Sequence, residues 1–76
     1  MDNAYDKAYM IARIAERARQ MSAYLAEVGI DEVMLDEMNE EYGDYLGVNF
    51  LIITTDGDEV HGFIKGMEDG IVDILI

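Results

Sequence analysis

The 76 residues are 51% hydrophobic, enough for one small domain with its own core and too apolar for a disordered acidic tail. The chain has no cysteine, which excludes disulfides, thiolate metal sites and a thiol nucleophile. Its formal net charge is −12, from 17 acidic residues against five lysines and arginines. That charge argues against direct binding to nucleic acids or anionic membranes, since both depend on basic clusters.

The charge imbalance lies entirely in the second part of the chain. Residues 1–30 hold four acids and four bases, whereas residues 31–76 hold thirteen acids and one base, Lys65. No signal peptide is recognisable at the start, and no apolar run, residues 50–53 included, is nearly long enough to span a membrane. We therefore expect a soluble, cytoplasmic, single-domain protein that spans residues 1–76.

The first segment predicts one long helix from about Asn3 to Val28. It is rich in alanine, contains no proline or internal glycine, and is followed by Gly29, which can end a helix. Six apolar residues at alternating steps of three and four form a continuous seam: Ile11, Ile14, Ala18, Met21, Leu25 and Val28. We expect this seam to pack on the chain's own second half in a monomer, with dimerisation through the helix as the alternative.

The next segment predicts a second helix, which begins with Asp31 as its N-cap and ends near Gly43. It is crowded with acids and has no base. The pairs Asp36 with Glu40 and Glu37 with Glu41 place like charges one turn apart, at a cost of about 0.2–0.5 kcal/mol each.

After residue 47 the pattern changes from helical to extended. Residues 48–55 predict a strand, the Asp56-Gly57 pair predicts a type I′ hairpin turn, and residues 59–65 predict the returning strand. A longer turn at residues 66–70 then leads to a last strand at residues 71–76. The expected fold is α+β, with two N-terminal helices on one face of a three-stranded antiparallel meander (α-α-β-β-β).

No catalytic or cofactor motif stands out. Ser22 lies within the predicted first helix, and His61 has no acid–base partner around it in sequence. Asp56 and Asp58 start like a calcium-binding EF-hand loop, but His61 occupies the position that requires glycine. We expect no enzyme activity, no metal and no cofactor.

The acids themselves are the candidate functional feature, because repulsion between them opposes folding and has no structural benefit. Regularly spaced carboxylates could present negative charge much as duplex DNA presents phosphates. Two tyrosines beside the acid run could anchor a partner or equally close the helix onto the sheet. The candidate partner-binding residues are Glu32, Asp36, Glu37, Glu40, Glu41, Tyr42, Asp44, Tyr45, Asp56, Asp58 and Glu59.

In size, charge and mixed α/β character the chain resembles the small acidic inhibitors of phages and mobile elements, including anti-CRISPR proteins and other DNA mimics. The resemblance implies a stoichiometric inhibitor that blocks the DNA-binding cleft of a CRISPR-Cas effector. Two alternatives stay open. One is an antitoxin or immunity protein that neutralises a basic toxin nuclease, and the other is a small homodimeric interaction module.

Overall fold

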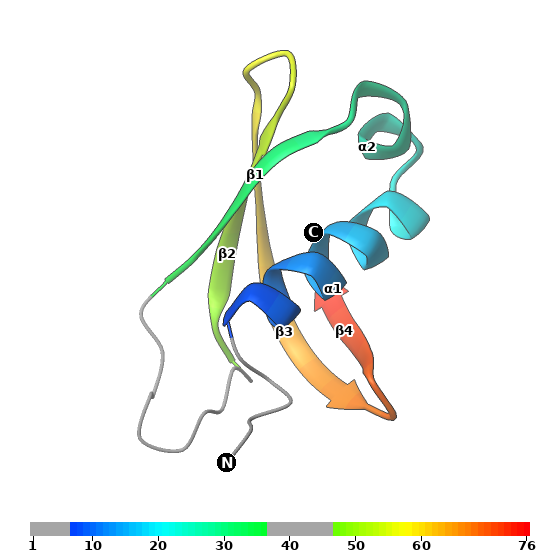
Figure 1. Cartoon of the computed structure of the whole chain (residues 1–76), viewed down its shortest axis with the longest axis vertical. Coiled ribbons are helices and arrows are strands. Elements are labelled where there is room, and N and C mark those ends of the chain that lie inside the picture. Colours follow the sequence, from blue (N-terminus) through cyan, green and yellow to red (C-terminus); the bar gives the residue numbers. More distant parts are fainter. Residues whose placement is uncertain (1–6, 37–46) are drawn as a thin grey trace.

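The computed structural model describes residues 7–36 and 47–76. Within these residues the chain forms an α+β fold in which helix α1 lies across one face of an antiparallel sheet (Figure 1). The elements in chain order are α1 (Lys7–Met21), α2 (Ala23–Val28), β1 (Ile30–Leu35), β2 (Asn49–Thr54), β3 (Glu59–Glu68) and β4 (Ile71–Leu75). The strands lie side by side in the order β1-β2-β3-β4, so each strand pairs with its neighbour in sequence.

The predicted first helix is divided in two at Ser22. This residue has an extended backbone, with φ −132° and ψ 116°, and its hydroxyl accepts a hydrogen bond from the backbone N–H of Leu25 at 3.2 Å. A serine in this role caps the start of a new helix instead of continuing the old one. The predicted end at Gly29 is confirmed, since Gly29 has φ 90° and its N–H donates to the Leu25 carbonyl at 3.0 Å.

The predicted second helix is wrong over the residues that the structure describes, because β1 occupies Ile30–Leu35. Val33 is buried opposite Ile52 of β2, while the adjacent Met34 points away and is exposed. Pairing with the apolar strand β2 therefore overrides the helical spacing of the sequence. The sheet has four strands and not three, and the rest of the predicted helix, residues 37–43, lies outside the described residues.

Both predicted hairpins form, with turns that differ from expectation. At the β2–β3 turn, Gly57 has φ 94° and its N–H donates to the Thr54 carbonyl at 3.0 Å. Asp56 keeps a negative φ, so this turn is not of type I′. The two positive φ values of that turn type occur instead at Asp69 (55°) and Gly70 (78°), between β3 and β4. Strand β3 accordingly extends to Glu68, beyond its predicted end.

The core lies between the helices and one face of the sheet. Alternate residues of the strands point into it, and the predicted helical seam packs there within the chain, as expected for Ile14, Ala18 and Leu25. Met21, the last residue of α1, is exposed instead. The buried apolar residues are Met10, Ile14, Ala18, Leu25, Val33, Val48, Phe50, Ile52, Ile64, Val72 and Ile74.

Candidate interaction surface

The structure describes five of the eleven residues predicted to bind a partner, and all five are exposed: Glu32, Asp36, Asp56, Asp58 and Glu59. The other six lie outside the described residues: Glu37, Glu40, Glu41, Tyr42, Asp44 and Tyr45. Within the described residues, the candidate interaction surface therefore consists of the acids of the sheet and its turns.

Four of these five acids come together at one end of the sheet. Glu32 and Glu59 are both opposite Ile53, from its two neighbouring strands, so they flank it on the same face. Strands are about 4.8 Å apart, which separates the two backbones by about 10 Å. Asp56 and Asp58 lie in the adjoining turn. Asp36 lies at the other end of β1, where its N–H donates to the Asn49 carbonyl at 3.0 Å.

We call this group the acidic end and add one residue that the sequence reasoning did not select. Asp31 is exposed and precedes Glu32 at the irregularity in β1 pairing, beside the same turn. The acidic end therefore comprises Asp31, Glu32, Asp56, Asp58 and Glu59.

The turn of the acidic end is held by a buried threonine. The Thr54 hydroxyl donates to the Asp56 carboxylate at 2.5 Å and accepts from the Asp58 N–H at 2.9 Å. The bond from Thr54 lowers the pKa of the Asp56 carboxyl, because it stabilises the charged form. Asp56 consequently keeps its negative charge below the ordinary range for an aspartate.

Helix α2 also fixes this turn. The Tyr24 hydroxyl donates to the Asp58 carboxylate and lies 3.5 Å from that of Asp56. The hydrogen bond to Asp58 raises the pKa of Tyr24, and desolvation raises it further to a smaller extent. On the same side the Thr55 hydroxyl donates to the Val28 carbonyl. No local pattern could have revealed the contact between Tyr24 and Asp58, since the two residues are 34 positions apart in sequence.

The face of the sheet opposite the core carries apolar side chains beside these acids. Met34, Leu51 and His61 lie in one cross-strand row, and Phe63 lies opposite Leu75 in another. Met34 is 42% exposed and Leu75 52% exposed. The Lys65 ammonium lies 3.8 Å from the Asp73 carboxylate. A partner at this face would meet an apolar centre beside the acidic end.

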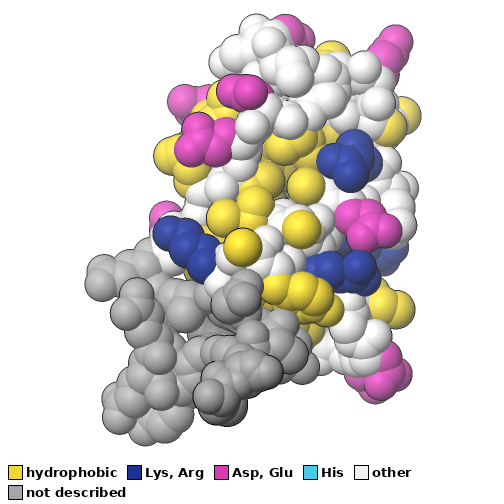
Figure 2. Space-filling model, viewed as in Figure 1, with side chains coloured by type: hydrophobic (Ala, Val, Ile, Leu, Met, Phe, Trp, Pro, Cys, Tyr) yellow, Lys and Arg dark blue, Asp and Glu magenta, His cyan; other side chains and the backbone are white. Residues whose placement is uncertain are grey.

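The basic residues are separated from the acidic ones. In the described chain, residues 7–29 carry four bases and two acids, whereas the sheet and its turns carry nine acids and only Lys65 as a base. Figure 2, viewed from the side of α1, shows the basic side chains around the helix, with most of the acidic ones towards the top, where the β2–β3 turn lies in Figure 1. The molecule thus has a basic side on α1 and an acidic sheet.

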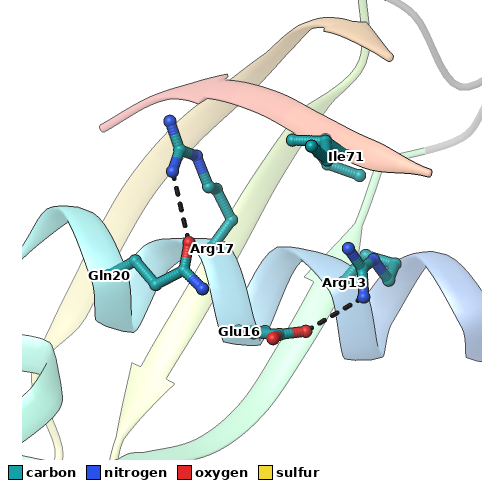
Figure 3. A pocket seen from close by; sticks show the side chains of 6 residues that line it. Arg13, Glu16, Arg17, Gln20 and Ile71 are labelled. Carbon is teal, nitrogen blue, oxygen red and sulfur yellow. Dashed lines mark hydrogen bonds and ion pairs between the residues drawn. The ribbon is translucent and has the colours of Figure 1, made fainter. Parts of the chain in front are cut away.

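A small pocket of about 170 Å³ lies between α1 and β4, lined by Arg13, Glu16, Arg17, Gln20, Ile71 and Val72 (Figure 3). Each arginine is bound within the helix: Arg13 Nη1 lies 3.0 Å from Glu16 Oε1, and Arg17 Nη1 donates to Gln20 Oε1 at 3.2 Å. The Nε atoms of both arginines are buried and have no hydrogen-bond partner in the described chain. Sequence reasoning missed this pocket, although the spacing of Arg13 and Arg17 places them on one helical face.

In residues 7–36 and 47–76, no group of three or more His, Cys, Asp and Glu side chains is placed to hold a metal ion. Neither α1 nor α2 is both long enough and apolar enough to cross a membrane. The chain matches no protein-family model, no curated protein and no solved structure.

Proposed function

We propose that this protein is a non-enzymatic inhibitor whose acidic end occupies the nucleic-acid-binding surface of a basic partner protein. One observation carries the proposal: five exposed carboxylates from β1, β3 and the turn between β2 and β3 gather at one end of the sheet, while the bases lie mainly on α1. A positively charged cleft attracts such a surface by the same long-range field that attracts phosphates.

Two features make the acidic end suitable for this role. The sheet fixes the separation of the Glu32 and Glu59 backbones, and Thr54 and Tyr24 hold the turn carboxylates by hydrogen bonds. Charges that are already in position lose little conformational entropy on binding. The apolar side chains beside them, such as Met34 and Leu51, supply contact area that exposed charge alone lacks.

The most specific form of the proposal is an anti-CRISPR protein that blocks the DNA-binding cleft of a CRISPR-Cas effector in the cytoplasm of the host cell. The size and charge of the chain support it, together with the mixed α+β fold. Such an inhibitor acts stoichiometrically, and its association rate rises steeply as salt is lowered.

The experiment is a gel-shift assay in which purified CRISPR effector complexes of several types meet this protein before their target DNA. We expect one complex to lose its DNA shift and to regain it as the DNA concentration is raised. The test variant is Glu32→Gln/Glu59→Gln, and the matched control is Glu68→Gln/Asp69→Asn, which removes the same charge at the other end of β3. Only the first should need more protein for inhibition, by about tenfold or more.

Two results would contradict the proposal. An unchanged DNA shift with every complex would exclude the CRISPR form of the function. Equal loss of inhibition in the two double variants would show that overall charge matters and the acidic end does not.

A further inference from the structure

The basic side of the molecule carries a second, independent feature at the free edge of the sheet. In the described chain β4 is the last strand of the sheet and is paired on one side only, with β3. Helix α1 lies beside it, and Arg13 and Arg17 line the pocket between the two elements. In Figure 3 the Arg17 side chain extends towards β4, whereas that of Arg13 lies along the helix towards Glu16. An unpaired strand edge presents backbone N–H and C=O groups that can bind an extended peptide.

The chemistry of the two arginines indicates the side chains of that peptide. Their Nη1 atoms are engaged within the helix, whereas their Nε atoms are buried without an acceptor. A buried donor without a partner is unfavourable, so rotation of the end of the side chain towards an acceptor is stabilising. Guanidinium groups bind carboxylates through two parallel hydrogen bonds, a geometry that the Nε edge provides.

The spacing of the arginines matches that of a strand. Residues four apart in a helix are separated by about 6 Å along its axis. Alternate residues of an antiparallel strand, which point to the same face, are separated by about 6.8 Å. Carboxylates at alternate positions of a strand added beside β4 would therefore have nearly the same separation as Arg13 and Arg17.

The side chains of β4 that point away from the core indicate which residue of the peptide fits between the two carboxylates. Asp73 points away from the core, between the exposed Ile71 and Leu75. The Asp73 carboxylate lies 3.8 Å from the Lys65 ammonium on one side. A lysine across the new strand pair would approach it from the other side, whereas a third acid there would be unfavourable.

We propose that the edge of β4, with Arg13 and Arg17, binds an extended segment of a partner protein as a fifth strand, with carboxylates at alternate positions and a lysine between them. A second copy of this chain fits the site less well, since two molecules of net charge −12 repel each other. A peptide with two glutamates and one lysine carries little net charge and escapes most of that repulsion.

The probe is the blocked peptide Thr-Val-Glu-Lys-Glu-Val-Thr, titrated into the full chain labelled with ¹⁵N and followed by NMR. We expect saturable shifts of the backbone amides of Ile71–Leu75 and of the Nε–H signals of Arg13 and Arg17. The scrambled peptide Thr-Val-Lys-Glu-Glu-Val-Thr places only one glutamate on the helix side, so it should bind about tenfold more weakly.

Protein variants distinguish binding at this site from a general effect of net charge. Arg17→Gln should weaken binding of the peptide by about tenfold, whereas Arg19→Gln removes the same charge from an exposed residue of α1 that does not line the pocket and should change binding little. A thermal melt of each variant shows that it is folded.

Several outcomes would overturn the proposal. They are the absence of saturable shifts in β4, equal binding of the two peptides, and equal loss in the Arg17 and Arg19 variants. Two other controls identify different occupants. Shifts of both arginines with inorganic phosphate, without changes in β4, would show a simple anion site. Shifts of β4 with protein concentration alone would show a contact between two copies.

Discussion

The ring of Phe50 lies against the backbone of Gly62, its direct partner across strands β2 and β3. A Cβ atom at Gly62 would come within 2.1 Å of the ring and 2.8 Å of the Leu75 carbonyl oxygen. Phe50 is almost completely buried, so its ring cannot move aside without disturbing the core. One glycine therefore makes room for the largest apolar side chain of the core.

We predict that Gly62→Ala lowers the free energy of unfolding by about 3 kcal/mol, because overpacking forces the ring and the strands apart. Urea denaturation measures the change. Gly66→Ala is the matched control on the same strand, since its Cβ would meet only the Asp73 Cβ, at 4.0 Å. If Phe50→Leu does not recover part of the loss in the double variant, the explanation by contact with the ring is wrong.

The capping role of Ser22 leads to a second prediction. Ser22→Ala removes the acceptor of the Leu25 N–H and should lower the free energy of unfolding by about 1 kcal/mol. Ser22→Asp keeps an acceptor at the same position and should retain most of the stability. Equal losses in the two variants, again measured in urea, would show that the hydroxyl does not cap α2.

The bond from Thr54 to Asp56 predicts a dependence on pH. The pKa of Asp56 is lower in the folded state than its ordinary value of 3.8, so its contribution is complete above that value and is lost as the pH falls through the lower, folded value. The difference in melting temperature between the wild type and Asp56→Asn should therefore shrink as the pH falls from about 5 to about 2. The other carboxylates are common to both proteins and cancel in this comparison.

The control for this prediction keeps the hydroxyl. Thr54→Ser retains the donor to Asp56 and should retain the pH-dependent difference, whereas Thr54→Val should remove it. A difference that stays constant over the whole pH range would contradict the assignment of Thr54 as the cause.

The acidic end predicts opposite effects on stability and binding. Glu59→Lys replaces one of two like charges that flank Ile53. It should raise the free energy of unfolding by about 0.8 kcal/mol at low salt, because a repulsion of about 0.4 kcal/mol across about 10 Å of water becomes an equal attraction. The gain should shrink in about 1 M salt, where charges are screened beyond about 3 Å. The same variant should inhibit DNA binding less well in the gel-shift assay. A loss of both stability and inhibition would show that Glu59 is structural.

Part of the fold could be predicted from the sequence because its signals are local. The end of the N-terminal helical segment at Gly29 depends on one glycine, and the β2–β3 hairpin depends on turn residues between two apolar runs. The β1 strand could not be distinguished from a helix, since Val33, Met34 and Leu35 are apolar in a row and fit either period. Its pairing with β2 is a contact across the intervening chain, which decides the outcome.

The acids of the candidate surface could be selected from sequence by type, but their grouping could not. Glu32 and Glu59 flank Ile53 only because β1 and β3 share β2 as a neighbour. Asp58 is held by Tyr24, which belongs to a different helix and carries no local signal. The pair Arg13 and Arg17 was visible as helical spacing, yet its relation to β4 required the complete sheet.

The order of the strands has a consequence for the time course of folding. Because β2, β3 and β4 follow one another through tight turns, the two hairpins that they form close short loops and can form early. The packing of α1 on β4 joins the first described element to the last, so it closes the longest loop and carries the largest entropic cost. We expect the strands to assemble in succession, with the docking of α1 as the step that limits the folding rate.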